Sequence, residues 1–94
     1  MARRRYLLAY DVRDQRRLQL VARCAEGFGD RVQYSVFVCD LSEVELIKMK
    51  TSLELLIDRG QDSIMVIDLG SEDASRFTFM GQPLKLPNNS ALII

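Results

Sequence analysis

Residues 6–17 have the sequence YLLAYDVRDQRR, and the apolar pattern changes in the middle of this segment. Its first part, Tyr6–Val12, is a short apolar run rich in strand-forming residues, which predicts a central strand buried on both faces. From Asp14 onward, apolar residues recur at steps of three and four, which predicts an amphipathic helix. We expect that helix to begin at an Asp14 cap and to end at Gly27 or Gly29. Its apolar positions are Leu18, Val21, Ala22, Ala25 and Phe28.

The next segment, Arg31–Leu41, alternates between two faces and predicts β-structure. One long strand and two short strands joined by a kink around Tyr34–Ser35 both fit this alternation. Ser42 and Glu45 then have the spacing of a capping box, which predicts a second helix that continues to about Ile57. The inner stripe of this helix should consist of Leu46, Met49, Leu53, Leu56 and Ile57.

The last third of the chain contains further strand candidates. Asp62–Leu69 includes the apolar run Ile64–Ile67 and predicts another buried strand, and Arg76–Met80 is a short fifth candidate. A tail with two prolines leads to the apolar end Ala91–Ile94. The order strand, helix, strands, helix, strand is typical of the ferredoxin-like βαββαβ sandwich. This is an α+β fold with two helices on one face of a sheet.

We therefore expect one ferredoxin-like domain over residues 1–94, with a core over 1–70 and a C-terminal strand and tail over 71–94. Helices on one face leave the other face of the sheet bare, and the predicted strands have apolar residues on both faces. A second copy of the chain would cover the bare face, so we expect a homodimer. The extra C-terminal strand is available for exchange between the two subunits.

The composition excludes several classes of protein. With 94 residues, 48% of them apolar and 28% charged, the chain has ordinary globular composition. No apolar run approaches the roughly 20 residues of a membrane helix, and the basic N-terminus lacks the apolar stretch of a secretory signal. We therefore expect a cytoplasmic protein with no membrane partner. The lack of histidine removes the commonest general base and zinc ligand, and Cys24 and Cys39 have no zinc-site or redox spacing.

The net charge of zero hides an asymmetry along the chain. Residues 1–40 contain eight arginines, no lysine and five acidic residues, whereas residues 41–94 contain five basic and eight acidic residues. Arginine presents a planar fork of donors that suits phosphate. The excess of arginine fits a polyanionic partner, and a solvated basic face is the alternative that the sequence leaves open.

Asp11 lies at the end of the predicted central strand, where an unpaired buried acid would be costly. One interpretation is a helix cap or an ion-pair partner of Arg13 or Arg16. The other is an oxygen ligand of Mg²⁺, which keeps several waters and takes one or two protein carboxylates. A two-fold axis near the strand end would bring two Asp11 carboxylates together. Arg16 and Arg17, in the first turn of the first helix, can reach the same end of the sheet and contact phosphate.

Three motifs follow one another in the sequence. Tyr10-Asp11-Val12 is followed by Asp14 and Arg16-Arg17, the block GDRVQYSVF occupies residues 29–37, and Asp62-Ser63-Ile64 precedes a predicted strand. Together they resemble the small CRISPR-associated adaptation protein of the Cas-two family. The resemblance covers about residues 5–70, and the block that contains Arg31 and Phe37 is quite specific. Many members have Glu after this phenylalanine, where the present chain has Val38, so no acid is assigned a role there.

The resemblance implies a homodimer that acts in CRISPR spacer acquisition, binds duplex DNA and bridges two dimers of the companion integrase in a heterohexamer. It also implies a metal-dependent endonuclease of RNA or DNA. Asp11 would be its catalytic residue and metal ligand, with one Mg²⁺ between the Asp11 carboxylates of the two chains. The family motif further implies nucleic-acid binding by Tyr10, Arg16, Arg17, Arg31, Ser35 and Phe37. A ferredoxin-like regulatory or toxin-type module is the remaining alternative, because the fold alone implies no function.

Overall fold

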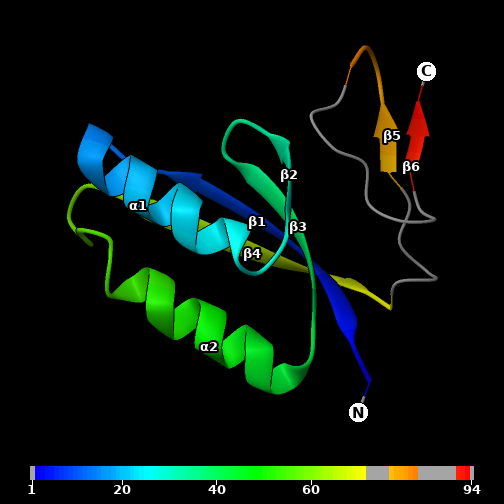
Figure 1. Cartoon of the computed structure of the whole chain (residues 1–94), viewed down its shortest axis with the longest axis horizontal. Helices are drawn as coiled ribbons and strands as arrows, with labels where there is room; N and C mark the ends of the chain where they lie inside the picture. Colours follow the sequence, from blue (N-terminus) through cyan, green and yellow to red (C-terminus); the bar gives the residue numbers. More distant parts are fainter. Residues whose placement is uncertain (1, 72–76, 83–90, 94) are drawn as a thin grey trace.

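A computed structural model of the chain describes residues 2–71, 77–82 and 91–93. The helices and strands of these residues (Figure 1) are β1 (Arg4–Asp11), α1 (Gln15–Glu26), β2 (Asp30–Gln33), β3 (Val36–Leu41), α2 (Glu43–Glu54), β4 (Ser63–Gly70), β5 (Phe77–Phe79) and β6 (Ala91–Ile93). From β1 to β4 they follow the expected order βαββαβ. Neither helix is long and apolar enough to cross a membrane.

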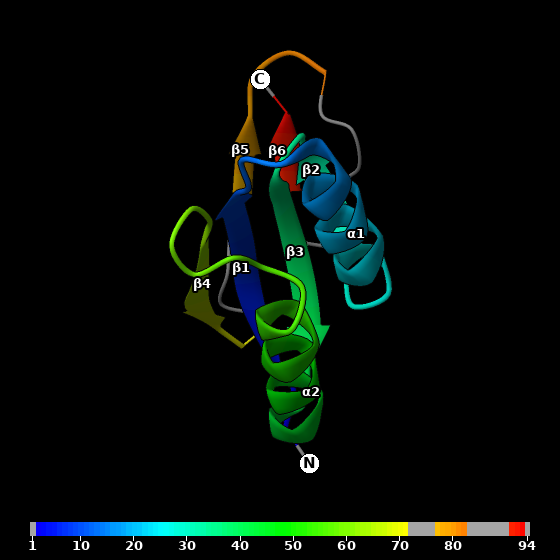
Figure 2. The same ribbon diagram turned by 90° about the vertical axis from the view of Figure 1, so that its left-hand side faces the viewer.

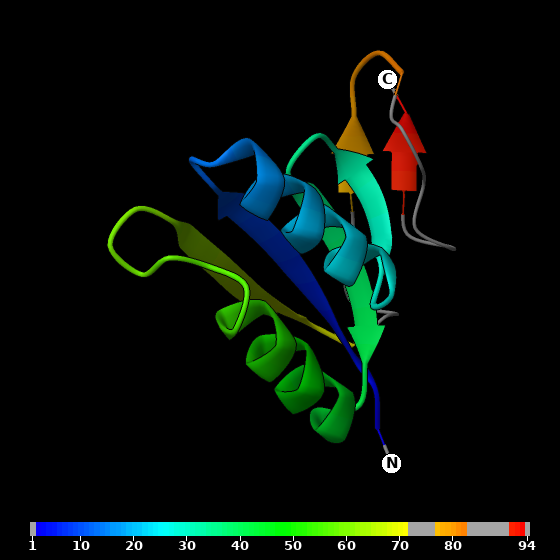
Figure 3. The same ribbon diagram turned by 60° about the vertical axis from the view of Figure 1, so that its left-hand side comes forward.

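Four strands form one antiparallel sheet in the order β2-β3-β1-β4, so β1 has a partner on each side. Leu8 of β1 lies opposite Phe37 of β3 on one side and opposite Val66 of β4 on the other. Both helices lie on the same face of this sheet (Figure 2, Figure 3). The α+β, ferredoxin-like fold predicted from the sequence is confirmed.

The alternation of β1 divides its side chains between the two faces of the sheet. Tyr6, Leu8 and Tyr10 point toward the helices and are buried, with exposed fractions of 7%, 0% and 7%. The apolar core on this face is therefore built around the central strand. Its other members are Val12, Val21, Ala25, Phe37, Cys39, Leu41, Met49 and Leu53.

We call the helix-free side of the sheet the open face. It contains Leu7, Ala9 and Asp11 of β1, and the strand register places Met65 and Ile67 of β4 beside them. Met65 and Ile67 are 53% and 41% exposed. The prediction of a buried strand over Asp62–Leu69 is therefore wrong for the open-face side of β4 in the single chain. The reason is that β4 lies at the edge of the sheet and packs only one of its faces against the core.

The first helix begins and ends where the sequence predicts. The Asp14 carboxylate accepts a hydrogen bond of 2.9 Å from the backbone nitrogen of Arg17, and Gly27 is the C-terminal cap. Gly29 then lets the chain pass close to β3, because a Cβ atom at this position would lie 2.5 Å from Cys39 Sγ. Any side chain at Gly29 would therefore push β3 away from the connection that follows α1.

The segment after α1 consists of two strands rather than one. β2 and β3 are antiparallel and are joined by a turn at Tyr34–Ser35, which decides between the two interpretations of this segment. α2 follows, and Ser42 and Glu45 form both hydrogen bonds of the predicted capping box. The helix ends at Glu54, earlier than the expected end near Ile57, although the turn that follows still packs against the core.

The C-terminal strands form a small sheet of their own. In the described residues, β5 and β6 pair with each other in parallel and do not join the four-stranded sheet. The expected fifth strand is confirmed over Phe77–Phe79, whereas Arg76 and Ile94 of the expected segments lie outside the described residues. The ring centroid of Phe77 lies 5.9 Å from the guanidinium carbon of Arg5. β5 therefore contacts the end of the sheet that is remote from Asp11.

Candidate nucleic-acid interface

Asp11 is the last residue of β1 and lies on the open face, opposite Ser63 of β4. Its side chain is exposed and forms no hydrogen bond or ion pair with any residue that the structure describes. The cap of α1 is Asp14, so neither the cap nor the ion-pair interpretation of Asp11 has a supporting contact here. An exposed carboxylate without a protein partner is available to bind a cation.

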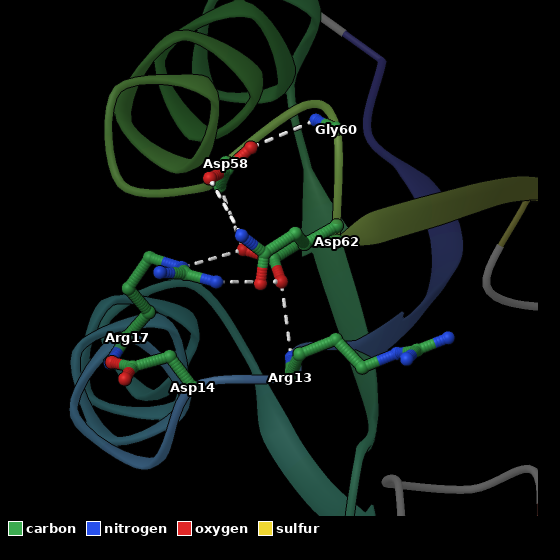
Figure 4. A network of polar contacts seen from close by, with 7 residues as sticks. Arg13, Asp14, Arg17, Asp58, Gly60 and Asp62 are labelled. Carbon is green, nitrogen blue, oxygen red and sulfur yellow. Dashed lines mark hydrogen bonds and ion pairs between the residues drawn. The ribbon is translucent and has the colours of Figure 1, made fainter.

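The buried carboxylate at this end of the sheet belongs to Asp62, directly before β4 (Figure 4). Its Oδ2 accepts hydrogen bonds from Arg17 Nε at 2.8 Å and from the backbone nitrogen of Asp58 at 2.9 Å. Its Oδ1 accepts hydrogen bonds from the backbone nitrogen of Arg13 at 3.0 Å and from Arg17 Nη2 at 3.2 Å. Asp62 therefore joins the β1–α1 loop, α1 and the α2–β4 loop.

These hydrogen bonds favour the charged forms of both partners. The Arg17 guanidinium, helped by the backbone N–H groups of Asp58 and Arg13, holds the pKa of the Asp62 carboxyl well below its usual range, although burial opposes the shift. The same contact raises the pKa of Arg17. Removing one member of a buried ion pair is strongly destabilising, because the other charge stays in the interior with too few partners. The pair is thus part of the folded structure.

Several arginines of the N-terminal half form ion pairs with acidic residues. The pairs are Arg3 with Glu45, Arg4 with Asp68, Arg5 with Asp40, and Arg17 with Asp62. Arg13, Arg16 and Arg23 have exposed side chains, and none of these side chains has a partner in the part of the chain that the structure describes. Arg23 lies in the last turn of α1, far from Asp11. Within the described residues, the arginines that follow β1 and have no acidic partner are therefore Arg13, in the β1–α1 loop, and Arg16, in the first turn of α1.

Tyr10, Arg31 and Phe37 meet on the helix-covered face of the sheet. The Tyr10 and Phe37 rings stack with centroids 6.1 Å apart. The guanidinium carbon of Arg31 lies 5.2 Å from the Phe37 centroid and 6.0 Å from the Tyr34 centroid, which is a cation–π geometry. The Tyr10 hydroxyl and Arg31 Nε are buried without a hydrogen-bond partner among the described residues. In this cluster, the Arg31 guanidinium therefore packs against aromatic rings rather than against a carboxylate of the described residues.

The structure brings four of the expected nucleic-acid-binding residues together, but on the face opposite to Asp11. Phe37 is fully buried and Tyr10 is nearly so. Ser35 lies in the β2–β3 turn, where its carbonyl accepts a hydrogen bond of 3.1 Å from the backbone nitrogen of Tyr10. A cavity of about 210 Å³ opens beside Arg31, between the hairpin and α1. In this conformation, Tyr10 and Phe37 support Arg31 and the hairpin rather than present their rings to solvent.

Within the described residues, Asp11 would supply a single carboxylate to a metal ion. The described residues contain no group of three or more acidic or cysteine side chains that could hold a metal ion. Mg²⁺ accepts one or two protein carboxylates and completes its octahedral shell with water. Asp11 is exposed and has no partner in the described part of the chain, so it fits the residue set of a Mg²⁺ site shared by two copies of the chain, to which each copy would contribute one carboxylate.

Comparison with known proteins identifies the family. The family described as CRISPR associated protein Cas2 matches residues 4–77 of this chain. The chain belongs to the Cas2 family. The match runs from the first residue of β1 to the first residue of β5, and it includes Asp11, Arg31 and Asp62. The resemblance stated from the sequence motifs is confirmed.

Individual Cas2 proteins are similar over most of their length. A CRISPR-associated endoribonuclease Cas2 of Rhodospirillum rubrum is 37% identical over 91 residues, which cover 95% of this chain and 89% of that protein. A CRISPR-associated endonuclease Cas2 of Halalkalibacterium halodurans is 34% identical over 80 residues, which cover 80% and 83% of the two chains. The structure of this chain aligns with the crystal structure of Streptococcus pyogenes Cas2 with a TM-score of 0.66 and 37% sequence identity. The alignment covers 70% of this chain and 86% of the S. pyogenes chain. The Cas2 fold is thus shared with an experimental structure.

The Arg17–Asp62 pair is the part of the site that sequence reasoning did not find. The sequence singles out Asp62 only within the motif Asp62-Ser63-Ile64 and assigns Arg17 to phosphate. The two residues lie 45 positions apart, so no local pattern connects them. One signal was present: an acid directly before a strand that neighbours β1 can reach the first turn of the helix that follows β1.

Proposed function

We propose that this protein is a CRISPR adaptation protein that forms a homodimer, binds duplex DNA and bridges two dimers of the companion integrase in a heterohexamer. Membership of the Cas2 family supports a role in CRISPR systems. The observation that carries the proposal is the end of β1, where Asp11 borders an apolar open face and has no partner among the described residues. The exposed Arg13 and Arg16 follow it in the β1–α1 loop and the first turn of α1.

The open face supports the homodimer. Met65 and Ile67 expose large apolar side chains on the same face as Leu7 and Ala9. Burying apolar surface stabilises association by roughly 25 cal/mol for each Å² removed from water. A two-fold dimer presents the same patch from both subunits, so one apolar face can cover the other. This arrangement would also place the two Asp11 residues on the shared face.

The charges support binding to the nucleic-acid backbone. Arg16 is exposed in the first turn of α1. The Arg31 guanidinium contacts the Phe37 ring and forms no ion pair with the described residues, so its positive charge is not neutralised by an acid there. Contacts to phosphate release counterions, so affinity should fall steeply with salt and depend little on base sequence. Ser35 and Phe37 would act by shaping the hairpin that carries Arg31. RNA is the alternative ligand, because some relatives are named endoribonucleases.

A second candidate function, metal-dependent endonuclease, is favoured by Asp11 itself. Relatives are named endoribonuclease or endonuclease, and the exposed carboxylate of Asp11 has no partner in the described part of the chain. The Asp11 residues of two subunits would hold one Mg²⁺. When bound, Mg²⁺ would polarise the phosphodiester and neutralise the charge that develops on it. Arg16 would bind and orient the phosphate beside the Asp11 pair.

Light scattering on the purified protein, alone and with the companion integrase and duplex DNA, tests the adaptation role. We expect the protein alone to have twice the 10.8 kDa mass of one chain. With integrase and duplex DNA, it should elute as one complex with two integrase dimers for each dimer of this protein. A stable 10.8 kDa species at micromolar concentration, or the absence of any complex with the integrase, would contradict the proposal.

Cleavage assays with RNA and with duplex DNA in millimolar Mg²⁺ test the endonuclease role separately. Asp11→Asn should abolish cleavage and leave the dimer and the integrase complex intact, because the arginines provide the phosphate contacts. A variant that cleaves as fast as the wild type would exclude Asp11 as the metal ligand. A wild-type protein that forms the complex but cleaves neither substrate would leave the adaptation role as the only function.

A further inference from the structure

Arg13 and Arg17 both donate to the Asp62 carboxylate, but their side chains extend in opposite directions from it (Figure 4). Arg17 donates through two nitrogens of its guanidinium. Arg13 donates through its backbone nitrogen. Asp62 therefore fixes the side chain of Arg17 and only the backbone of Arg13. The guanidinium of Arg13 stays exposed, without a partner in the described residues.

A phosphate contact through the Nε–Nη2 edge of Arg17 would require its guanidinium to leave Asp62, because both nitrogens donate to that carboxylate. Nε and Nη2 both face the carboxylate, and the side chain is only 25% exposed. After such a movement, the buried charge of Asp62 would be left with the backbone N–H groups of Arg13 and Asp58. A buried ion that loses its charged partner is strongly unfavourable. The Asp62 contact therefore opposes the use of Arg17 as a phosphate ligand.

Arg13 is better placed than Arg17 to bind a phosphate group. Val12 is buried in the core with 8% of its surface exposed, whereas its neighbours Asp11 and Arg13 are both exposed. β1 ends at Asp11, and Arg13 follows the buried Val12 in the β1–α1 loop with its side chain exposed. Figure 4 shows the Arg13 side chain extending away from α1. Arg13 thus lies two residues beyond Asp11, with a side chain that is exposed and directed away from α1.

We propose that Arg13 binds a phosphate of the nucleic acid beside Asp11, together with Arg16, and that Arg17 is a structural partner of Asp62 without a phosphate contact. The inference rests on the nucleic-acid binding proposed above. A guanidinium can donate two parallel hydrogen bonds to phosphate oxygens, and neither exposed arginine has another partner in the part of the chain that the structure describes. Asp62 contributes by holding the backbone of Arg13 next to the end of β1.

The charges around Asp62 agree with a structural role for Arg17 and a phosphate-binding role for Arg13 and Arg16. Arg17 and Asp62 cancel each other inside the fold, and the Asp14 carboxylate accepts the hydrogen bond that caps α1. Arg13, in the β1–α1 loop, and Arg16, in the first turn of α1, therefore supply the positive charge that has no acidic partner among the described residues of this segment. A phosphodiester that approached Asp11 alone would be repelled, and two neighbouring guanidinium groups offset that repulsion.

The test compares single glutamine variants in a salt titration of binding to a fluorescently labelled duplex DNA of two to three helical turns. The variants are Arg13→Gln, Arg16→Gln and Arg17→Gln, with Arg23→Gln as the matched control. Arg23 is also an exposed arginine on α1, but it lies at the other end of the helix. The melting temperature of each variant is measured on the same samples, and binding is measured well below the lowest melting temperature.

We expect the plot of log Kobs against log salt to become shallower by about 0.9 for each phosphate that a variant no longer neutralises, hence by about 2 if both subunits of a dimer bind one duplex. Arg13→Gln and Arg16→Gln should show this change at an unaltered melting temperature. Arg17→Gln should lower the melting temperature and keep the wild-type slope. Arg23→Gln should change neither quantity.

An unaltered slope in Arg13→Gln, or a slope in Arg17→Gln as shallow as in Arg16→Gln, would overturn the inference while the proposed function stands. If Arg17→Gln does not fold, the double variant Arg17→Gln/Asp62→Asn replaces it, because it removes the charge at residue 17 without leaving an unpaired buried carboxylate. A wild-type protein whose binding to the duplex does not depend on salt would overturn the proposed function, and the inference with it.

Discussion

Asp11 and Asp62 lie at the same end of the sheet, because Asp11 pairs with Ser63, the residue that follows Asp62. Asp62 is buried and accepts hydrogen bonds from Arg13, Arg17 and Asp58, whereas Asp11 is exposed and accepts none from the described residues. A buried acid must be paired, and an exposed acid is free for other partners. The donors around a carboxylate, rather than its place at a strand end, thus separate a structural acid from a candidate functional one.

The largest effect is expected for Asp62→Asn. The asparagine amide would place its own N–H donors against Arg17 and would remove the charge that compensates the guanidinium. We expect the melting temperature to fall by on the order of 10 °C. Thermal melting followed by circular dichroism measures this change.

Asp68→Asn is the matched control, because Asp68 also pairs with an arginine of the N-terminal half but lies half-exposed at the surface. Exposed ion pairs contribute little to stability, so this variant should melt close to the wild type. If Asp68→Asn lowered the melting temperature as much as Asp62→Asn, burial would not be the property that distinguishes the two pairs.

The acid stability of the protein should depend on Asp62. Folding lowers the pKa of this carboxyl from its usual 3.8, so the pair stabilises the folded state fully above that pH. Protonation in the unfolded state then removes the stabilisation as the pH falls below about 4 toward the lower pKa of the folded state. Melting curves recorded between about pH 6 and pH 2 should show this loss in the wild type.

The same series on Asp62→Asn should show a smaller loss. A residual dependence will remain, because Asp68 and Glu45 also have lowered pKa values, owing to hydrogen bonds from Arg4 and from Ser42 respectively. Identical acid profiles for the wild type and Asp62→Asn would mean that Asp62 does not carry the charge that the hydrogen bonds imply.

Asp11→Asn should have a much smaller effect on stability without metal. The side chain is exposed and forms no hydrogen bond or ion pair with the described residues, so we expect the melting temperature to stay within about 3 °C of the wild-type value. A drop as large as that of Asp62→Asn would show that Asp11 has a structural partner. Asp11 would then no longer contrast with Asp62.

The smallest effect is expected for Tyr10→Phe. Tyr10 adjoins Asp11 in the sequence but points into the core, where its hydroxyl has no hydrogen-bond partner among the described residues. Removing an unpaired buried hydroxyl costs no hydrogen bond, so the melting temperature should be unchanged or rise by about 3 °C or less. Differential scanning calorimetry resolves such a shift. A clear decrease would place a partner on this hydroxyl.

The sequence predicted the fold well because the decisive signals are local. The change of pattern at Asp14 and the capping box of Ser42 and Glu45 depend on neighbouring residues, and both appear in the structure. Exposure of Met65 and Ile67 was missed because it depends on strand order, which places β4 at the edge of the sheet.

The site was predicted less completely for a similar reason. Asp11 could be selected from its place at the end of a strand, but the roles of adjacent arginines depend on contacts across the fold. Arg16 and Arg17 look equivalent in the sequence, yet only Arg17 meets Asp62 from the α2–β4 loop. Which of two neighbouring cations is already paired is a property of the tertiary structure.

The most direct test of the contrast between Asp11 and Asp62 is a Mg²⁺ titration followed by thermal melting. A metal that binds only the folded protein raises its melting temperature. We expect millimolar Mg²⁺ to raise the melting temperature of the wild type and, by the same increment, that of Asp62→Asn from its lower starting value. Asp11→Asn should not respond. A response that persists in Asp11→Asn, or that disappears in Asp62→Asn alone, would contradict the account.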